Sequence, residues 1–204
     1  MVDQEYITSF LKRVEGWFER LYIPCFLKGG GSANYFGGPN PERYIAMGAS
    51  GCTVGIGCDL GQTDLKTVLS YGVDPGVAEI FIPYYGKKKD AAIRVLHERP
   101  LTVPYDVAWA LTVGVHHGYL EKWVRPAYEK KSGVKFDTLP RQAQAVIMSL
   151  CYQKGVGGVQ RDFPKTWGYL TSQDWAAASS ELKHGFPQYK TRRAIEGKLL
   201  EELL

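Results

Sequence analysis

The chain has 204 residues, of which 45% are hydrophobic and 23% are charged. These values exclude a disordered chain and a small peptide that needs disulfides or metal ions to fold, and they allow one sizeable domain or two small lobes. The formal net charge of +4 favours approach to polyanions such as nucleic acid, anionic lipid or bacterial wall polymers. Because the basic residues form no dense tract with interleaved aromatic residues, nucleic acid is not an expected partner.

The cysteines give no sign of a metal centre. Cys25, Cys52, Cys58 and Cys151 form no CxxC pair and lack zinc-ligand spacing with the four histidines. We therefore expect no metal ion or cofactor, and four free thiols. The alternative, for an exported protein, is a disulfide between Cys25 and Cys52.

The N-terminal residues 1–5 carry acids where a signal peptide carries positive charge, and the sequence contains no run of about 18 apolar residues. We therefore expect a soluble protein, synthesised in the cytoplasm without its own export signal and without a transmembrane segment. A monomer is expected.

Residues 3–22 have the spacing of an amphipathic helix, which Pro24 is expected to end. Its apolar positions are Tyr6, Ile7, Phe10, Leu11, Val14, Trp17, Phe18 and Leu21. Glu15 lies beside this apolar stripe, and Glu19 repeats the placement less clearly. A carboxyl group that is partly removed from water holds its proton more readily, as general acid catalysis requires. The alternative for Glu15 is a glutamate at the edge of the stripe that reaches solvent.

Residues 24–51 are rich in glycine and are predicted to form an ordered loop. The next stretch, residues 53–61, alternates as a β-strand does, with four apolar side chains on one face. The other face carries the Thr53 hydroxyl group and the Asp59 carboxylate, and is otherwise glycine. A strand face without side chains lets a ligand approach the backbone; the alternative is a buried edge strand that ends in a turn.

The rest of the chain is predicted to be helical. Three shorter helices are expected first: one from Thr63 to Gly72, one that begins at Asp74-Pro75, and one over residues 87–98. A long helix follows from Pro104 to about Lys130, with a bend at Pro126. The last three expected helices run from Thr138 to Gly155, from Ser172 to Lys183, and from about Gln188 to the C-terminus. His116 and His117 are adjacent in the long helix, so they point in different directions. We interpret them as structural residues and not as joint ligands of one ion.

This order of parts resembles that of the phage-type lysozymes. In that family the first helix carries the catalytic glutamate, and a small sheet carries a Thr-(Ile/Val)-Gly-(Ile/Tyr)-Gly segment like residues 53–57. The likeness continues in residues 147–155, 174–178 and 192–194. It implies an α+β fold, mostly helical and two-lobed, with a small β-sheet or hairpin in the N-terminal lobe.

The resemblance also implies a single lysozyme-like catalytic domain over residues 1–204. Within it we expect a lobe with the small sheet over about 15–100, a long helix over about 104–130 and a helical C-terminal lobe over about 131–204.

One departure from the phage endolysins indicates a particular branch of the superfamily. Those enzymes carry their second acid between the glutamate and the threonine, and here that interval is the glycine-rich stretch 24–51 without a matching acid. Asp59 instead follows Thr53 by six positions. This order is similar to that of the pesticin branch, bacterial toxin muramidases in which the aspartate comes after the threonine.

The resemblance implies three catalytic residues: Glu15 as the acid, Thr53 to position water and Asp59 to polarise it. In one straight strand Thr53 and Asp59 would lie about 20 Å apart, at roughly 3.3 Å per residue, too far to share a water molecule. We therefore predict a tight turn over residues 55–57 that folds the stretch into a hairpin.

Three residues of the C-terminal half complete the expected site. By resemblance, Tyr152 and Gln153 line the sugar cleft and Arg193 holds the Glu15 carboxylate in place. The alternative for Arg193 is a cation at a helix end.

The function that the resemblance implies is that of a muramidase, which hydrolyses the glycan strands of peptidoglycan. The alternatives are a lytic transglycosylase or chitinase, and a peptidoglycan-binding module without activity. A toxin, a secreted effector or a phage endolysin would act on the wall of the target bacterium, with an immunity protein, a secretion machine or a holin as further partners.

Overall fold

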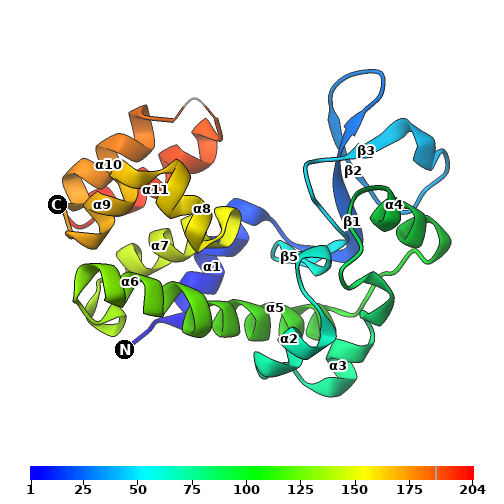
Figure 1. Ribbon diagram of the computed structural model, residues 1–204, viewed down its shortest axis with the longest axis horizontal. Helices are drawn as coiled ribbons and strands as arrows, with labels where there is room; N and C mark the ends of the chain where they lie inside the picture. The colour runs from blue at the N-terminus through cyan, green and yellow to red at the C-terminus, as the bar shows by residue number, and fades with distance from the viewer. Residues whose placement is uncertain (187) are drawn as a thin grey trace. The chain divides into compact units, whose positions relative to one another are not determined.

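The computed structural model describes residues 1–186 and 188–204 and contains helices together with a small antiparallel sheet of five strands (Figure 1). This confirms the predicted α+β class. The chain forms two compact units. The first unit combines residues 1–14 with residues 119–204, and the second covers residues 15–118.

The first unit is helical throughout its described elements. They are α1 (Gln4–Glu15, whose last residue belongs to the second unit), the π-helical segment η4 (Leu120–Val124), α6 (Arg125–Ser132), η5 (Phe136–Thr138), α7 (Arg141–Lys154), α8 (Val156–Asp162), α9 (Pro164–Thr171), α10 (Trp175–His184) and α11 (Lys190–Glu201). Every residue of α7 from Ala143 to Cys151 is buried. A helix that is buried on all sides is the centre of a core, so α7 organises this unit.

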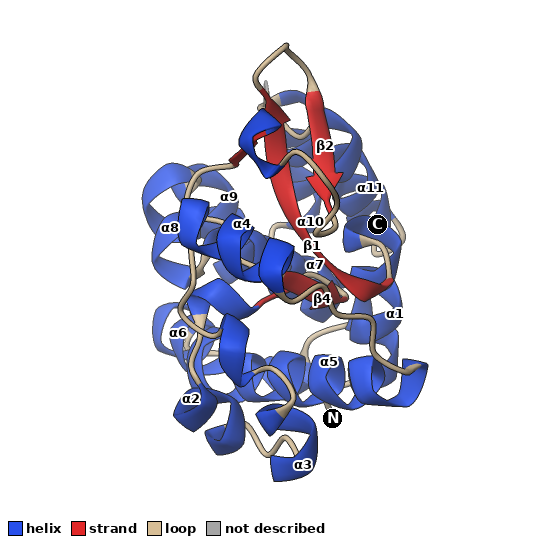
Figure 2. Cartoon of the chain, turned by 90° about the vertical axis from the view of Figure 1, so that its right-hand side faces the viewer, coloured by secondary structure: helices blue, strands red, loops and turns tan. Residues whose placement is uncertain are grey.

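The second unit contains the sheet. Its strands are β1 (Phe18–Leu27), β2 (Ser32–Tyr35), β3 (Tyr44–Ala46), β4 (Thr53–Gly55) and β5 (Cys58–Asp59), in the order β2-β1-β4-β5, with β3 also paired to β1. The helical segments are η1 (Pro41–Arg43), η2 (Leu60–Gln62), α2 (Leu65–Ser70), α3 (Pro75–Glu79), η3 (Ile82–Tyr84), α4 (Lys89–Glu98) and α5 (Tyr105–Tyr119). Strand β1, the longest, connects all parts of the sheet, and α4 packs against β1 and β3 (Figure 2).

The predicted helix over residues 3–22 is wrong in its second half. Helix α1 ends at Glu15, and Gly16 follows with φ of 82°, a conformation in which glycine commonly ends helices. From Phe18 onward the chain is the strand β1, in which Leu21, Ile23 and Cys25 enter the core at every second position. Trp17, Phe18 and Leu21 follow Val14 at helical spacing, which is why the sequence predicts that the helix continues.

The predicted loop over residues 24–51 is also corrected, because it contains the end of β1 and all of β2 and β3. Pro24 does not end a helix but lies inside β1. Its missing N–H group is tolerated there, and its carbonyl oxygen accepts a hydrogen bond from the Met47 N–H at 2.9 Å.

Most other helices lie where the sequence predicts them, with shifts at their starts. Asp74 caps α3 as expected, but Asp64 and not Thr63 caps α2, and α7 begins at Arg141 and not at Thr138. Asp174 caps α10, two residues after the predicted start at Ser172. The long helix from 104 to 130 is present as α5, η4 and α6, with Pro126 in the first turn of α6. The terminal helix begins at Lys190, and α8 and α9 were not predicted.

The four cysteines are free and buried, so the predicted free thiols are confirmed and the alternative disulfide between Cys25 and Cys52 is wrong. Burial raises the pKa of the Cys25 thiol to about 11 and that of Cys52 to about 12. Both thiols therefore remain protonated and inert near neutral pH. Among the residues that the structure describes, no helix is long and apolar enough to cross a membrane.

Helix α5 holds the tip of the β4–β5 hairpin. The tip residue Ile56 is fully buried, its N–H group donates to Thr112 Oγ1 at 3.4 Å, and its carbonyl oxygen lies 3.1 Å from His116 Nε2. Because a carbonyl oxygen only accepts hydrogen bonds, Nε2 of His116 carries the proton. Burial lowers the pKa of His116 to about 4. His116 is thus uncharged and holds the hairpin tip through this hydrogen bond, in agreement with its interpretation as a structural residue.

Because His116 is buried in its uncharged form, we predict that the protein loses stability in mild acid. The unfolded chain takes up a proton at His116 near the ordinary pKa of 6.5, whereas the folded protein takes it up only near 4. The contribution of His116 to the free energy of unfolding is therefore fully present above pH 6.5. It decreases by up to about 3 kcal/mol as the pH falls toward 4. The variant His116→Gln keeps an N–H donor but does not titrate. Urea unfolding at pH 7 and pH 4.5 should show a smaller difference for this variant than for the wild type.

The matched control is His117→Gln, because His117 is the adjacent histidine and is exposed. It should behave as the wild type does. Equal acid sensitivity of all three proteins would contradict the role given to His116.

Candidate active site

The predicted hairpin over residues 53–59 is confirmed. Thr53 on β4 pairs directly with Asp59 on β5, and Val54 pairs with Cys58, so the turn lies at residues 55–57. Directly opposed residues of antiparallel strands have Cα atoms about 4.5–5.5 Å apart and side chains on the same face. The hydroxyl and the carboxylate that the sequence singled out are therefore neighbours.

The glycines of this turn serve contacts within the chain. Gly55 and Gly57 have φ values of 63° and 68°, which glycine adopts without strain. A Cβ atom on Gly55 would lie 2.1 Å from Thr112 Oγ1, and one on Gly57 would lie 3.2 Å from Glu15 Oε2. Because these two glycines have no side chains, helix α5 can pack against the hairpin at Gly55 and the Glu15 carboxylate can lie against it at Gly57.

Glu15 is the last residue of α1 and the first residue of the second unit. Its side chain is partly buried, and its carboxyl carbon lies 3.3 Å from the position of a Cβ atom on Gly57. Gly57 is two residues from Asp59, whose strand partner is Thr53. The three predicted catalytic residues, Glu15, Thr53 and Asp59, are therefore brought together within one unit.

The Asp59 carboxylate also supports the local backbone. Its Oδ1 accepts hydrogen bonds from the N–H groups of Gly61, at 2.9 Å, and Gly51, at 3.1 Å. Its Oδ2 lies 3.3 Å from Gln62 Nε2. Asp59 is thereby the N-cap of η2 and joins the two chain segments that flank the hairpin. Burial raises the pKa of Asp59 above its ordinary value, and these hydrogen bonds act in the opposite direction.

The Thr53 side chain is 4% exposed, and its hydroxyl group lies 3.4 Å from the carbonyl oxygen of Gly51. At this length the hydrogen bond is weak. The hydroxyl group can thus donate to or accept from another group, such as a water molecule. Cleavage of a glycosidic bond uses two carboxyl groups. Two lie at this hairpin, Glu15 beside Gly57 and Asp59 opposite Thr53.

The remaining predicted residues belong to the first unit. Gln153 lies in the last turn of α7 and accepts a hydrogen bond from Arg193 of α11. Tyr152 packs edge-on against Tyr119, with ring centroids 5.9 Å apart. The expected contact between Arg193 and Glu15 stays a prediction, as does the contact of Tyr152 and Gln153 with sugar.

Arg193 has an acidic partner, Glu196, which the sequence analysis did not single out although it follows Arg193 by three positions in the same helix. Glu196 is fully buried and is ion-paired with Arg193 and with Arg192, whose Nε lies 3.1 Å from Glu196 Oε1. Ser149 of α7 donates a further hydrogen bond to Glu196 at 2.6 Å. Burial raises the pKa of Glu196, and the two arginines oppose that effect. Arg193 is therefore a buried residue of this network, at 1% exposure, and lies near the start of α11.

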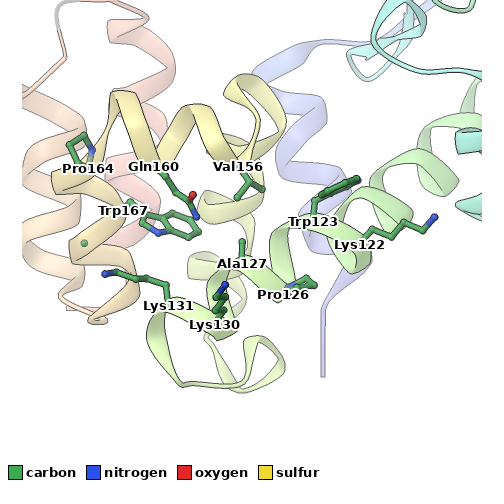
Figure 3. A pocket seen from close by; sticks show the side chains of 11 residues that line it. Lys122, Trp123, Pro126, Ala127, Lys130, Lys131, Val156, Gln160, Pro164 and Trp167 are labelled. Atoms are coloured by element: carbon green, nitrogen blue, oxygen red, sulfur yellow. The ribbon is translucent and has the colours of Figure 1, made fainter.

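A separate cavity of about 810 Å³ lies in the first unit, between η4 and α6 on one side and α8 and α9 on the other (Figure 3). Three lysines line it together with Trp123 and Trp167, and its lining contains no acidic residue: Lys122, Trp123, Pro126, Ala127, Lys130, Lys131, Val156, Gln160, Pro164, Trp167 and Gly168. In Figure 3 the Lys131 side chain lies below Trp167. None of the residues predicted for the site lines this cavity.

Sequence reasoning missed two residues around the predicted acids. Gln62 contacts Asp59, and the short spacing of Asp59, Gly61 and Gln62 at the start of a helical turn is a capping signal that could have identified it. Tyr22 lies in register with Thr53. It was missed because residues 3–22 are predicted as a helix, and a helical residue has no cross-strand partner.

The hydrogen bonds of Asp59 predict a stability cost for its removal. Asp59→Ala should lower the free energy of unfolding by about 2 kcal/mol, because it removes an N-cap and leaves the Gly51 N–H group without its acceptor. Asp64→Ala, which removes only an exposed N-cap of α2, should cost less than Asp59→Ala. Urea unfolding of both variants measures the difference. An Asp59→Ala variant as stable as the wild type would contradict this role.

Comparison with known proteins identifies the family of the chain. No curated protein matches the chain. A family described as "Pesticin: Bacterial toxin homologue of phage lysozyme, C-term" matches residues 28–176, well over half of the chain. The matched range includes Thr53, Asp59, Tyr152 and Gln153, whereas Glu15 precedes it. The chain belongs to this family of bacterial toxin homologues of phage lysozyme, the branch that the position of Asp59 after Thr53 predicts.

Proposed function

We propose that this protein is a muramidase that hydrolyses the β-1,4 bond between N-acetylmuramic acid and N-acetylglucosamine in peptidoglycan. The observation that carries the proposal is the β4–β5 hairpin, which pairs Thr53 with Asp59 beside the Glu15 carboxylate. Membership of a family of phage lysozyme homologues supports the same reaction.

In this mechanism Glu15 donates its proton to the oxygen of the leaving sugar. The bond between that oxygen and the anomeric carbon breaks, and positive charge develops on the sugar that remains. Thr53 accepts a hydrogen bond from the attacking water, and Asp59 stabilises the positive charge that the water acquires as it adds. Water supplies both the hydroxyl group of the new reducing end and the proton that restores Glu15.

The other predicted contacts extend this proposal. Tyr152 and Gln153 would line the sugar cleft, and Arg193 would hold the Glu15 carboxylate in place. The enzyme would act in the periplasm or wall of a target bacterium, as a toxin, effector or endolysin. An immunity protein in the producing cell, or a secretion or holin system, would then be a partner.

Replacement of the proposed acid tests the function. Glu15→Gln should lower the release of reducing ends from purified cell walls by at least about 100-fold, because general acid catalysis contributes roughly 10²- to 10⁴-fold. Glu19→Gln is the matched control: Glu19 lies four residues away and accepts a hydrogen bond from Trp17 Nε1, which glutamine can also accept. Activity of Glu15→Gln near that of the wild type would end the assignment.

The contact of Glu15 with Gly57 predicts a second result. Gly57→Ala should lower activity more than tenfold, because the new Cβ atom would lie 3.2 Å from Glu15 Oε2 and displace it. Gly86→Ala is the matched control, since Gly86 has the same φ of 68° but nothing within 4 Å of the corresponding position. Both variants should lose about 1 kcal/mol of stability from backbone strain. Equal activity of the two variants would show that Gly57 does not serve Glu15.

A further inference from the structure

Tyr22 occupies a place in the sheet that brings it to the proposed catalytic residues. It lies in register with Thr53 on β4, and Thr53 lies in register with Asp59 on β5. Opposed residues of antiparallel strands share a face, so the three side chains form one row across the sheet. The neighbours of Tyr22 along β1, Leu21 and Ile23, enter the hydrophobic core on the other face. The row therefore lies on the face away from the core.

The ring of Tyr22 is held firmly while its hydroxyl group is available. The residue is 7% exposed, and its ring packs against Phe18 and Phe36 at centroid distances of 4.5 and 6.0 Å. Within residues 1–186 and 188–204 its hydroxyl group forms no hydrogen bond, and the oxygen reaches solvent. A tyrosine whose ring is held by packing and whose hydroxyl group forms no hydrogen bond can present that hydroxyl group as a donor at a fixed position.

The charges around the Tyr22 hydroxyl group come from both proposed acids. Burial raises the pKa of Tyr22, and the nearby side chains of Glu15, Cys58 and Asp59 raise it further, with Glu15 the strongest of the three. The rings that pack against Tyr22, those of Phe18 and Phe36, are uncharged, and the Arg20 guanidinium group lies 5.5 Å from the centroid of the Phe36 ring. Tyr22 therefore stays protonated and remains a hydrogen-bond donor at every pH at which the protein would work.

We propose that Tyr22 is a positioning residue for Glu15, and that its hydroxyl group donates a hydrogen bond to the Glu15 carboxylate as the proton leaves for the glycosidic oxygen. This inference rests on the proposed function. A hydrogen bond to a charged acceptor is stronger than one to a neutral acceptor, so the contact favours the state in which Glu15 has given up its proton. It also steadies the carboxylate that must take up a proton before the next turnover.

The variant Tyr22→Phe tests the proposal, because it keeps the packed ring and removes only the hydroxyl group. With solubilised peptidoglycan strands as substrate, kcat should fall about ten- to hundredfold, as expected for the loss of a hydrogen bond to a charged group, while KM stays unchanged. The high-pH limb of the activity profile, where the acid loses its proton, should move to higher pH. A purely structural role of Tyr22 would not move that limb.

Tyr35→Phe is the matched control. Tyr35 is a buried tyrosine of the same sheet whose hydroxyl group donates to the Gly38 carbonyl oxygen at 2.8 Å, and Glu15 is not among the charges that act on it. Its removal should lower the melting temperature but leave the pH profile in place. Melting temperatures of both variants identify any loss of folding.

The outcomes separate this inference from the function on which it rests. An active wild type, an inactive Glu15→Gln variant and a Tyr22→Phe variant with wild-type kcat and pH profile would overturn the role of Tyr22 alone. A wild type that releases no reducing ends would overturn the proposed function and this inference together. A fall in kcat with a shifted high-pH limb, seen for Tyr22→Phe and not for Tyr35→Phe, supports it.

Discussion

The turn over residues 55–57 is the constraint on which the candidate site depends. Two glycines with positive φ reverse the chain there, and the backbone of Ile56 between them is tied to Thr112 and His116 of α5. The reversal brings Thr53 opposite Asp59, and the missing side chain of Gly57 leaves room for Glu15. A change in this turn would therefore separate all three proposed catalytic groups at once, although none of them belongs to the turn itself.

Asp59 serves the fold and the proposed reaction with the same carboxylate. Hydrogen bonds from Gly51 and Gly61 fix its orientation, and an oriented acceptor suits the polarisation of a water molecule because little reorganisation is needed during the reaction. The cost is that a loss of activity on removal of Asp59 would combine a folding effect with a catalytic one. For this reason Glu15, and not Asp59, is the residue whose replacement carries the functional argument.

Local patterns predicted the hairpin, and long-range contacts explain most of what they missed. The alternation over residues 53–61, together with the distance between Thr53 and Asp59 in a straight strand, required a reversal at the glycines. The strand β1 was mistaken for a helix because its apolar residues continue the stripe of α1, and only Gly16 marks the change. The contacts of Arg193 with Gln153 and of Arg192 with Ser149 depend on α7 and α11 meeting in space, which no spacing along the chain reveals. The ion pairs of both arginines with Glu196 lie within α11, at helical spacing.

The chemistry of the new chain ends tests the central claim most directly. Purified peptidoglycan would be digested with the protein, reduced with borohydride and examined by mass spectrometry. The proposed hydrolysis predicts soluble fragments whose ends are reduced N-acetylmuramic acid, because water supplies the hydroxyl group of each new end. Fragments ending in 1,6-anhydro-N-acetylmuramic acid would indicate a lytic transglycosylase, and intact strands that only bind the protein would indicate a wall-binding module. Either result would contradict the account.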